Sequence, residues 1–185
     1  MKLQRTSTTT FTNVISLATA KAHLRVDHSD EDALITSLIS TAGEIVEEYT
    51  GQYLSSCGFT YYADHFTSLM KIHAGPGIRI TNVQYTDTTN TTQTWSAENW
   101  YFDAKSHPMR VQFENLPTEV DDRVHAVQIT GEAGYTTVPE TLKSAMLLII
   151  GHLYEHRKDI LVGVQSAPLV HGAKYLMDKF KPSTF

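Results

Sequence analysis

The residues best spaced for chemistry are two histidines and a glutamate in the segment HLYEH, residues 152–156. On a helix, histidines four positions apart lie on one face and can both bind zinc, while a glutamate between them could activate water. This is the HxxEH pattern of one class of zinc peptidases, which also needs a third ligand. His152, Glu155 and His156 are therefore weak metal candidates, and a zinc-dependent hydrolase is one alternative function. The simpler interpretation places both histidines at the edge of a core or in an interface.

Other chemistry-bearing patterns are missing from the sequence. It contains no GxGxxG, GxxxxGK[ST] or GxSxG motif, so we expect no catalytic residues and no cofactor. The single cysteine, Cys57, excludes an internal disulfide and is expected to be a small buried hydrophobe. A cluster of aromatic residues could stack on a sugar or a base, which leaves a tail-associated β binding module as a second alternative. That cluster comprises Trp95, Trp100, Tyr101 and Phe102.

Composition is that of an ordinary folded protein of one domain, or of one domain with an insert. The chain has 185 residues, of which 41% are hydrophobic and 19% are charged. Twenty acidic and 15 basic residues leave a net charge of -5, which argues against a surface that coats nucleic acid. The longest strongly apolar stretch, Ala145 to Ile150, is far too short to span a membrane, and the N-terminus has no apolar signal segment.

The elements that would position these residues begin with two helices. Ser16 can cap a short helix over residues 17–26. Ser29 and Asp32 resemble a capping box for a second helix of about 20 residues, for which Gly51 is a natural stop. The apolar stripe of this second helix is broad. Its main row is Leu34, Leu38, Ala42, Ile45 and Tyr49, widened by Ile35, Ile39 and Val46.

Residues 55–135 have the features of antiparallel strands. Apolar and polar residues alternate over 109–113 and 78–80, and a change of phase predicts a bulge near Thr81 and Asn82. The polar run over 86–94, centred on Asn90, is expected to form a solvated hairpin tip that a partner could order. Further strands are expected over 100–102 and 124–130. This block therefore predicts a small sandwich or an open barrel.

A second helical block follows. Pro139 starts an amphipathic helix that reaches about Asp159, and a last short helix covers residues 173–180. Because the two broad apolar helices need each other as partners, we expect an α+β fold. A long amphipathic helix packs on C-terminal helices, and an antiparallel β-sandwich or open barrel is inserted between them. The expected units are a helical domain over 14–54 plus 136–181 and a β insert over 55–135.

Three segments, in this order, resemble one known family. They are the helix pair that includes HLRV and ends in YTG (15–51), the VxYxD strand with its hairpin (80–103), and the AGY turn leading to a helix that closes with YEHR (131–160). The chain resembles the head–tail connector proteins of tailed bacteriophages, also called adaptor or head-completion proteins, in the branch with a β insert. Relatives often have YENR in place of YEHR, which explains His156 without zinc.

This resemblance implies a structural virion protein that is not an enzyme. It would form a homo-oligomeric ring, usually of about twelve subunits, beneath the portal protein. The ring would extend the DNA channel, encircle double-stranded DNA without sequence-specific binding, and support a stopper or tail-completion protein. The expected location is the virion neck after assembly in the bacterial host cytoplasm, with no membrane involved. In related adaptors the C-terminal segment docks on the portal, which makes Phe180 and Phe185 candidate anchors.

Ring formation requires an apolar surface that the subunit itself does not cover. We expect Ile35, Ile39 and Val46 to supply this surplus as subunit-interface candidates on the second helix. On this hypothesis, a charged residue in place of Ile39 abolishes rings and leaves a folded monomer. Loss of the fold would instead show that Ile39 belongs to the core.

Overall fold

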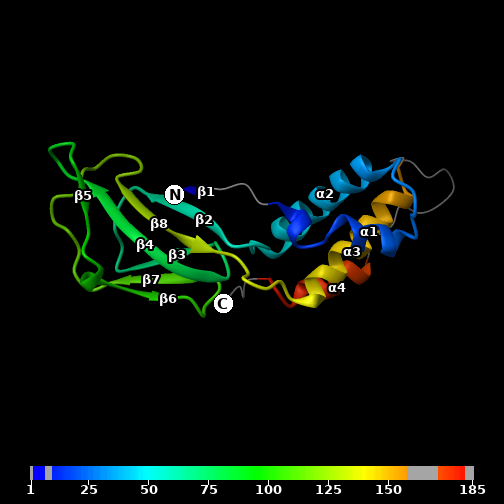
Figure 1. Cartoon of the computed structure of the whole chain (residues 1–185). Helices are drawn as coiled ribbons and strands as arrows, with labels where there is room; N and C mark the ends of the chain where they lie inside the picture. Colours follow the sequence, from blue (N-terminus) through cyan, green and yellow to red (C-terminus); the bar gives the residue numbers. More distant parts are fainter. Residues whose placement is uncertain (1, 7–9, 158–170, 182–185) are drawn as a thin grey trace. The chain divides into compact units, whose positions relative to one another are not determined.

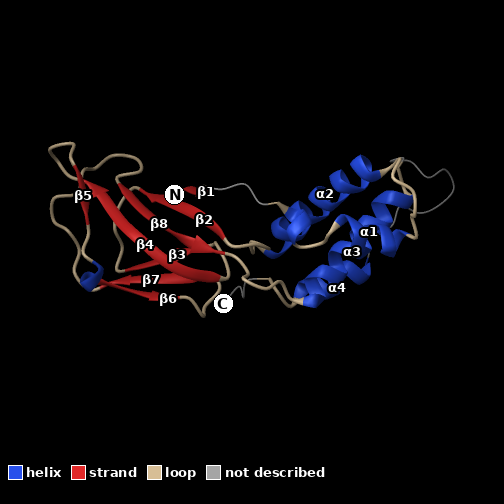
Figure 2. Ribbon diagram, in the orientation of Figure 1, coloured by secondary structure: helices blue, strands red, loops and turns tan. Residues whose placement is uncertain are grey.

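A computed structural model describes residues 2–6, 10–157 and 171–181 and contains two units. Residues 10–54, 137–157 and 171–181 form one unit, called the helical unit, and residues 2–6 and 55–136 form the other, called the β unit. Figure 2 shows the helices in the first unit and the long strands in the second. The predicted α+β class with inserted antiparallel strands is confirmed.

The helical unit contains four α-helices. Its long helices α2 and α3 pack against each other, and α4 packs on α3, while α1 contacts both α2 and α3 (Figure 1). The helices are α1 (Leu17–Leu24), α2 (Asp32–Thr50), α3 (Glu140–Glu155) and α4 (His171–Asp178), preceded by the short 3-10 helix η1 (Phe11–Asn13).

Most of the helix ends follow the signals in the sequence. The Ser16 hydroxyl accepts a hydrogen bond from the Thr19 amide at 3.1 Å, so the predicted cap of α1 is confirmed. Gly51 ends α2 in the left-handed conformation, with φ of 66°. The capping box at Ser29 is wrong: α2 begins after Glu31, and no side chain caps it. The amide of Asp32 instead donates to the Ser29 carbonyl oxygen, which makes a turn.

Packing between α2 and α3 forms the core of the helical unit. The buried residues of both helices recur at three- and four-residue steps, which places them on one face of each helix. Full burial of an aliphatic side chain stabilises the fold by about 1.5–3 kcal/mol. The fully buried members are Ile35, Ile39, Ala42 and Val46 on α2 and Leu142, Ala145, Met146 and Ile150 on α3.

Two antiparallel sheets make up the β unit. The five-stranded sheet has the order β1-β2-β8-β4-β5, and the three-stranded sheet has the order β3-β7-β6. The first sheet comprises β1 (Lys2–Arg5), β2 (Cys57–Ala63), β8 (Val127–Ala133), β4 (Gly77–Thr86) and β5 (Thr92–Thr94), and the second comprises β3 (Leu69–Ile72), β7 (Met109–Phe113) and β6 (Trp100–Asp103).

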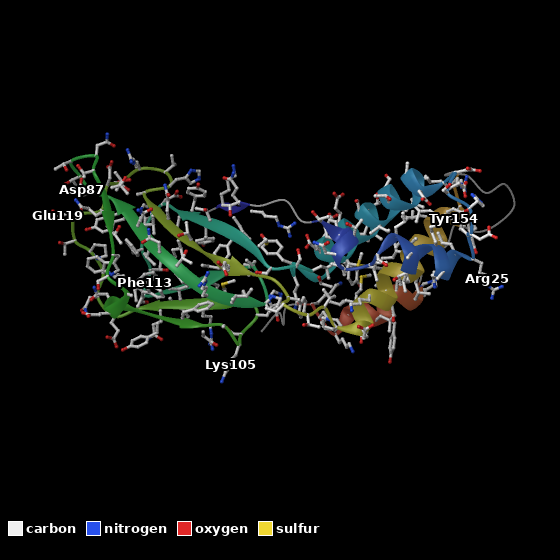
Figure 3. All side chains as sticks on the ribbon, in the orientation of Figure 1. Arg25, Asp87, Lys105, Phe113, Glu119 and Tyr154 are labelled. Carbon is white, nitrogen blue, oxygen red and sulfur yellow. The ribbon has the colours of Figure 1, made fainter. Side chains whose placement is uncertain are left out.

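The two sheets share an apolar core. Phe66, in the loop between β2 and β3, contacts Phe113 of one sheet and Tyr85 of the other, with ring centroids 5.1 Å and 5.9 Å away. Figure 3 shows Phe113 among the side chains between the sheets. The register between β4 and β8 shifts between Ile80 and Asn82, which confirms the predicted bulge. Cys57 is buried at the start of β2, as expected.

Strand β1 is an element that the sequence analysis did not predict. It contains four residues and pairs with β2, so that Leu3, for example, lies opposite Tyr61. Because its pairing partner is more than 50 residues away, no local pattern marks it. Among the described residues, no helix is both long and apolar enough to cross a bilayer.

Candidate interaction surfaces

The YEHR segment contributes to a polar cluster at the start of α2. The Tyr154 hydroxyl donates a hydrogen bond to Glu31 Oε2, and Arg157 Nη2 donates to Glu31 Oε1 at 2.6 Å. The Arg157 guanidinium also lies over the Tyr154 ring, 4.6 Å from its centroid. These three residues, called the latch, connect the end of α3 to the start of α2, and Figure 3 labels Tyr154 in this region.

A second ion pair continues the connection to α1. Lys21 Nζ lies 2.6 Å from Asp32 Oδ1, so Glu31 and Asp32 are each matched by a cation from outside α2. Both carboxylates also lie at the positive end of the α2 dipole, where a negative charge is favourable. Lys21 of α1 and the YEHR segment therefore meet the start of α2 and connect three helices.

The latch shifts the pKa of its members in opposite directions. The hydrogen bond from Tyr154, followed by that from Arg157, holds the pKa of Glu31 below its ordinary value of 4.5. The same hydrogen bond raises the pKa of Tyr154, because the ionised carboxylate favours the protonated phenol. A lowered pKa in the folded state means that Glu31 stabilises the fold above about pH 4.5. This contribution disappears as the pH falls through the lowered value.

We expect Tyr154→Phe to raise the pKa of Glu31 toward 4.5 and to lower the thermal stability of the helical unit. The measurement is a carbon-13 NMR titration of the Glu31 carboxyl group, together with thermal unfolding at pH 7. Tyr175→Phe is the matched control, because Tyr175 is 80% exposed and should leave the Glu31 titration unchanged. An unaltered Glu31 titration in Tyr154→Phe would contradict the role assigned to the latch.

The weak metal candidates lie at the C-terminal end of α3. Glu155 is the last helical residue, His156 follows the helix, and their side chains are exposed. The imidazole rings of His152 and His156 contact each other edge to face, with centroids 4.7 Å apart. Within residues 2–6, 10–157 and 171–181, no group of three His, Cys, Asp or Glu side chains is placed to hold a metal ion. Asp159, where the sequence analysis expected this helix to end, lies outside the described residues.

The subunit-interface candidates require a correction. Ile35, Ile39 and Val46 are 0% exposed, so they belong to the core of the helical unit and present no surface to a neighbouring subunit. The apolar stripe of α2 is broad enough for two rows, and packing against α3 covers the row that the sequence analysis assigned to the interface. The more exposed residues belong to the other row, although Ala42 of that row is 0% exposed. Leu34 is 36% exposed, and Leu38, Ile45 and Tyr49 are half-buried.

The hairpin tip between β4 and β5 is ordered by its own side chains, which corrects the expectation that a partner orders it. Asp87 Oδ1 accepts hydrogen bonds from the Thr89 amide at 2.9 Å, the Thr89 hydroxyl at 2.6 Å and the Thr91 amide at 2.9 Å. Asp87 Oδ2 accepts from Gln93 Nε2 at 2.9 Å. Asn90 adopts the left-handed conformation expected at the centre of the turn, with φ of 63°.

A neighbouring loop braces the same tip. Arg123 Nη1 donates to Asn90 Oδ1 at 2.5 Å, and Arg123 Nη2 donates to the Thr86 hydroxyl at 2.7 Å. The Thr88 amide donates to the Glu119 carbonyl oxygen at 3.2 Å, and Figure 3 shows Asp87 and Glu119 at the same end of the β unit. The Thr89 hydroxyl, followed by Gln93, holds the pKa of Asp87 well below its ordinary value of 3.8. Asp87 therefore stays ionised, and the tip stays closed, in mild acid.

We expect Asp87→Ala to open the tip, because it removes the acceptor of four hydrogen bonds at once. The amides of Thr89 and Thr91 should exchange with solvent at least about tenfold faster. Native-state hydrogen exchange measures this, with Asp122→Ala as the control in the adjacent loop. The Asp122 side chain is 96% exposed and lies 3.8 Å from His65. Unchanged protection of Thr89 and Thr91 in Asp87→Ala would show that the tip does not depend on Asp87.

The aromatic residues considered for stacking do not share one surface. Trp95 contacts the Tyr85 ring edge to face and donates from Nε1 to the Asn115 carbonyl oxygen at 3.2 Å. Along β6, Tyr101 is 59% exposed, whereas Trp100 and Phe102 are half-buried. Alternation along the strand separates them, because successive side chains point to opposite faces of a sheet.

The structure describes only one of the two candidate portal anchors, Phe180. Phe180 is half-buried rather than exposed. Its backbone carbonyl oxygen accepts a hydrogen bond from Gln52 Nε2 at 2.8 Å. Lys179 Nζ lies 5.0 Å from the centroid of the Phe180 ring. Phe185 lies outside the described residues.

Residues 14–93 match the sequence model of the phage gp6-like head–tail connector proteins. This match begins at Val14, directly after η1, and extends through both N-terminal helices to the β4–β5 hairpin, so the resemblance to head–tail connector proteins is confirmed. A comparison with curated protein sequences found no match.

Solved structures with the same fold come from virus-like particles. The chain is 20% identical, with a TM-score of 0.82, to a chain in the virion of a native gene transfer agent particle. It is 22% identical, with a TM-score of 0.79, to a chain in the neck of an empty gene transfer agent particle computed with C6 symmetry. The alignments cover 100% of this chain and 97% of each matched chain. Together with the family match, they support a structural adaptor role at a head–tail junction.

Proposed function

We propose that this chain is a non-enzymatic subunit of a ring in the neck of a phage-like particle. The ring lies beneath the portal protein, extends the channel for double-stranded DNA and supports a stopper or tail-completion protein. The observation that carries this proposal is the match of residues 14–93 to the head–tail connector proteins. The fold shared with neck structures along the whole chain, some of them computed with C6 or C12 symmetry, supports a ring.

The two units suit two tasks at such a junction. The helical unit has a core that is closed by ion pairs between helices, so it can keep its shape while its outer faces meet neighbouring subunits. In the β unit, the hairpin tip is stabilised internally and is therefore a preorganised surface on which a tail-side protein could dock. We assign the tip to the stopper side of the ring on these grounds.

The acidic net charge of the chain favours a channel that does not retain DNA. The net charge of -5 provides no basic excess to neutralise phosphates, which agrees with a ring that encircles DNA without sequence-specific binding. Tight duplex binding that weakens steeply with salt would contradict this part of the proposal.

Electron microscopy of the purified chain, with and without the portal protein of the same particle, tests the ring. We expect rings of uniform diameter, either alone or on the portal. A chain that stays monomeric in both samples, or one that binds stoichiometric zinc and hydrolyses peptides, would overturn the proposed function.

A further inference from the structure

Two glutamates on α2 lie where their own helix disfavours them. Glu44 and Glu48 are exposed in the last two turns of α2, near the negative end of the helix dipole. They are also four residues apart, so they repel each other on the helix surface. Neither carboxylate has a hydrogen-bond or ion-pair partner among the described residues. Glu47 between them differs, since its Oε1 accepts a hydrogen bond from the Leu54 amide at 2.8 Å.

Helix α4 shows the opposite arrangement. Lys174 is exposed at the fourth position of this helix, whose first turn has no acidic residue, so a cation lies toward the positive end of the dipole. The adjacent Tyr175 is 80% exposed. Among the described residues, neither Lys174 nor the Tyr175 hydroxyl has a polar partner.

The surface around Tyr175 is hollowed, and one lysine and one aspartate lie in the lining of the hollow. A cavity of about 370 Å³ is lined by residues from α3 and from the α4 segment, among them Thr141, Leu176 and Lys179. Lys179 Nζ donates to the Thr141 hydroxyl at 3.2 Å. The acidic Asp178 in this surface is already engaged, since it accepts a hydrogen bond from the Tyr49 hydroxyl at 2.6 Å. The exposed Tyr175 ring beside this hollow, with the exposed Lys174 next to it on α4, suits a partner with small side chains and free carboxylates.

The outward face of α2 has this composition. It lies opposite the core face, and its first half consists of small residues that permit close approach. We call it the acidic face, and it comprises Ala33, Ser37, Thr41, Glu44 and Glu48. We call the outward face of α4 the basic face, and it comprises His171, Lys174 and Tyr175. The exposed Asp178 follows at its C-terminal end, where Tyr49 and Lys181 engage the carboxylate.

We propose that neighbouring subunits are joined by the acidic face of one copy packed against the basic face of the next. Lys174 pairs with Glu44 and Glu48 of the neighbour, and Tyr175 packs against the small residues of the acidic face. The two faces are different surfaces of one chain, so the contact is heterologous and can close a ring by rotation. Each interface also offsets the unfavourable placement of charge at two helix ends. This inference rests on the proposed function, which supplies the ring.

Charge reversal at both faces tests the contact in the full chain. We expect Glu48→Lys and Lys174→Glu each to lower the fraction of subunits in rings at least about tenfold, because each juxtaposes like charges. The chain that carries both substitutions should recover rings. Glu155→Lys is the matched control, since Glu155 is an exposed glutamate at the end of α3 and should leave ring formation intact. Ring fraction is counted by electron microscopy, with the portal present if assembly requires it, and circular dichroism checks that each variant folds.

Cysteine cross-linking gives a second measurement. A chain with Glu48→Cys and Lys174→Cys should form a ladder of covalent oligomers when assembled rings are oxidised with diamide. Chains with one of the two substitutions should not form a ladder, because the native Cys57 is buried. Rings that persist in both single charge reversals, or that give no ladder, overturn this contact and leave the proposed ring intact. Failure of the unsubstituted chain to form rings with or without the portal overturns the proposed function and this contact together.

Discussion

Ile39→Asp is expected to unfold the helical unit, and not merely to prevent rings. Ile39 is 0% exposed between α2 and α3, so the substitution removes about 1.5–3 kcal/mol of apolar burial and places a carboxylate without a partner in the core. Such a change lowers the free energy of unfolding by about 4–5 kcal/mol or more, which is a large part of the total stability of a typical domain. Circular dichroism should show the loss of helix, and thermal unfolding should lose the transition of this unit.

The control for this experiment is Ser37→Asp, two residues away on the same helix. Ser37 lies on the exposed face of α2, so we expect a change of less than about 1 kcal/mol in the free energy of unfolding. A folded Ile39→Asp monomer that fails to form rings would contradict the assignment of Ile39 to the core. It would return Ile39 to the subunit interface.

Gly134→Ala should have the second largest effect. Gly134 has φ of 115°, a conformation that residues with a side chain rarely adopt. An added Cβ would lie 2.1 Å from the Ser55 carbonyl oxygen, a backbone atom that cannot move independently of the chain. The Gly134 amide also donates to the Pro76 carbonyl oxygen at 2.8 Å, so a backbone shift would cost this hydrogen bond. We expect Gly134→Ala to lower the free energy of unfolding by about 3 kcal/mol or more, because the strained backbone and the overlap act together.

Chemical denaturation of the full chain measures this effect. Gly172→Ala is the comparison, because among the described residues a Cβ at that helical position would meet only Leu148 Cδ1, at an ordinary 3.6 Å. For Gly172→Ala we expect the free energy of unfolding to rise by about 0.5–1 kcal/mol, since alanine is the better helix former. Equal effects of the two substitutions would show that the turn at Gly134 is not strained by a side chain.

Two segments that carry the family resemblance have a physical explanation in the structure. The AGY segment contains Gly134, whose backbone conformation excludes other residues at the end of β8. In the YEHR segment, Tyr154 and Arg157 hold Glu31 at the start of α2, while His156 lies exposed beyond α3. An asparagine in place of His156 would therefore leave the latch intact. Tyr154, which lies inside the HLYEH segment, therefore belongs to a contact between helices.

Several elements could be predicted because their causes are local. The period of the apolar stripe predicted α2, Ser16 predicted the start of α1, and Gly51 predicted the end of α2. The alternation over 109–113 predicted β7, whose bounds agree with the structure. The change of phase near Thr81 and Asn82 predicted the bulge, because a one-residue insertion moves the following side chains to the other face.

The errors concern contacts between distant segments. Glu31 and Tyr154 are 123 positions apart, so no local pattern could show that a tyrosine and an arginine hold the start of α2. Strand β1 acquires its structure only by pairing with β2. The order of the hairpin tip depends partly on Arg123, which comes from another loop.

The sequence by itself determined the α+β class, the long amphipathic helix and the family of head–tail connector proteins that the chain resembles. It could not decide which edge of the α2 stripe is buried, because its residues define a wide apolar band and hydrophobicity does not distinguish two rows of it. Only the tertiary structure decided that Ile35, Ile39 and Val46 face α3 while Leu34, Leu38 and Ile45 remain half-exposed. The physical reason is that burial depends on where the partner helix lies, and that position results from packing along the whole chain.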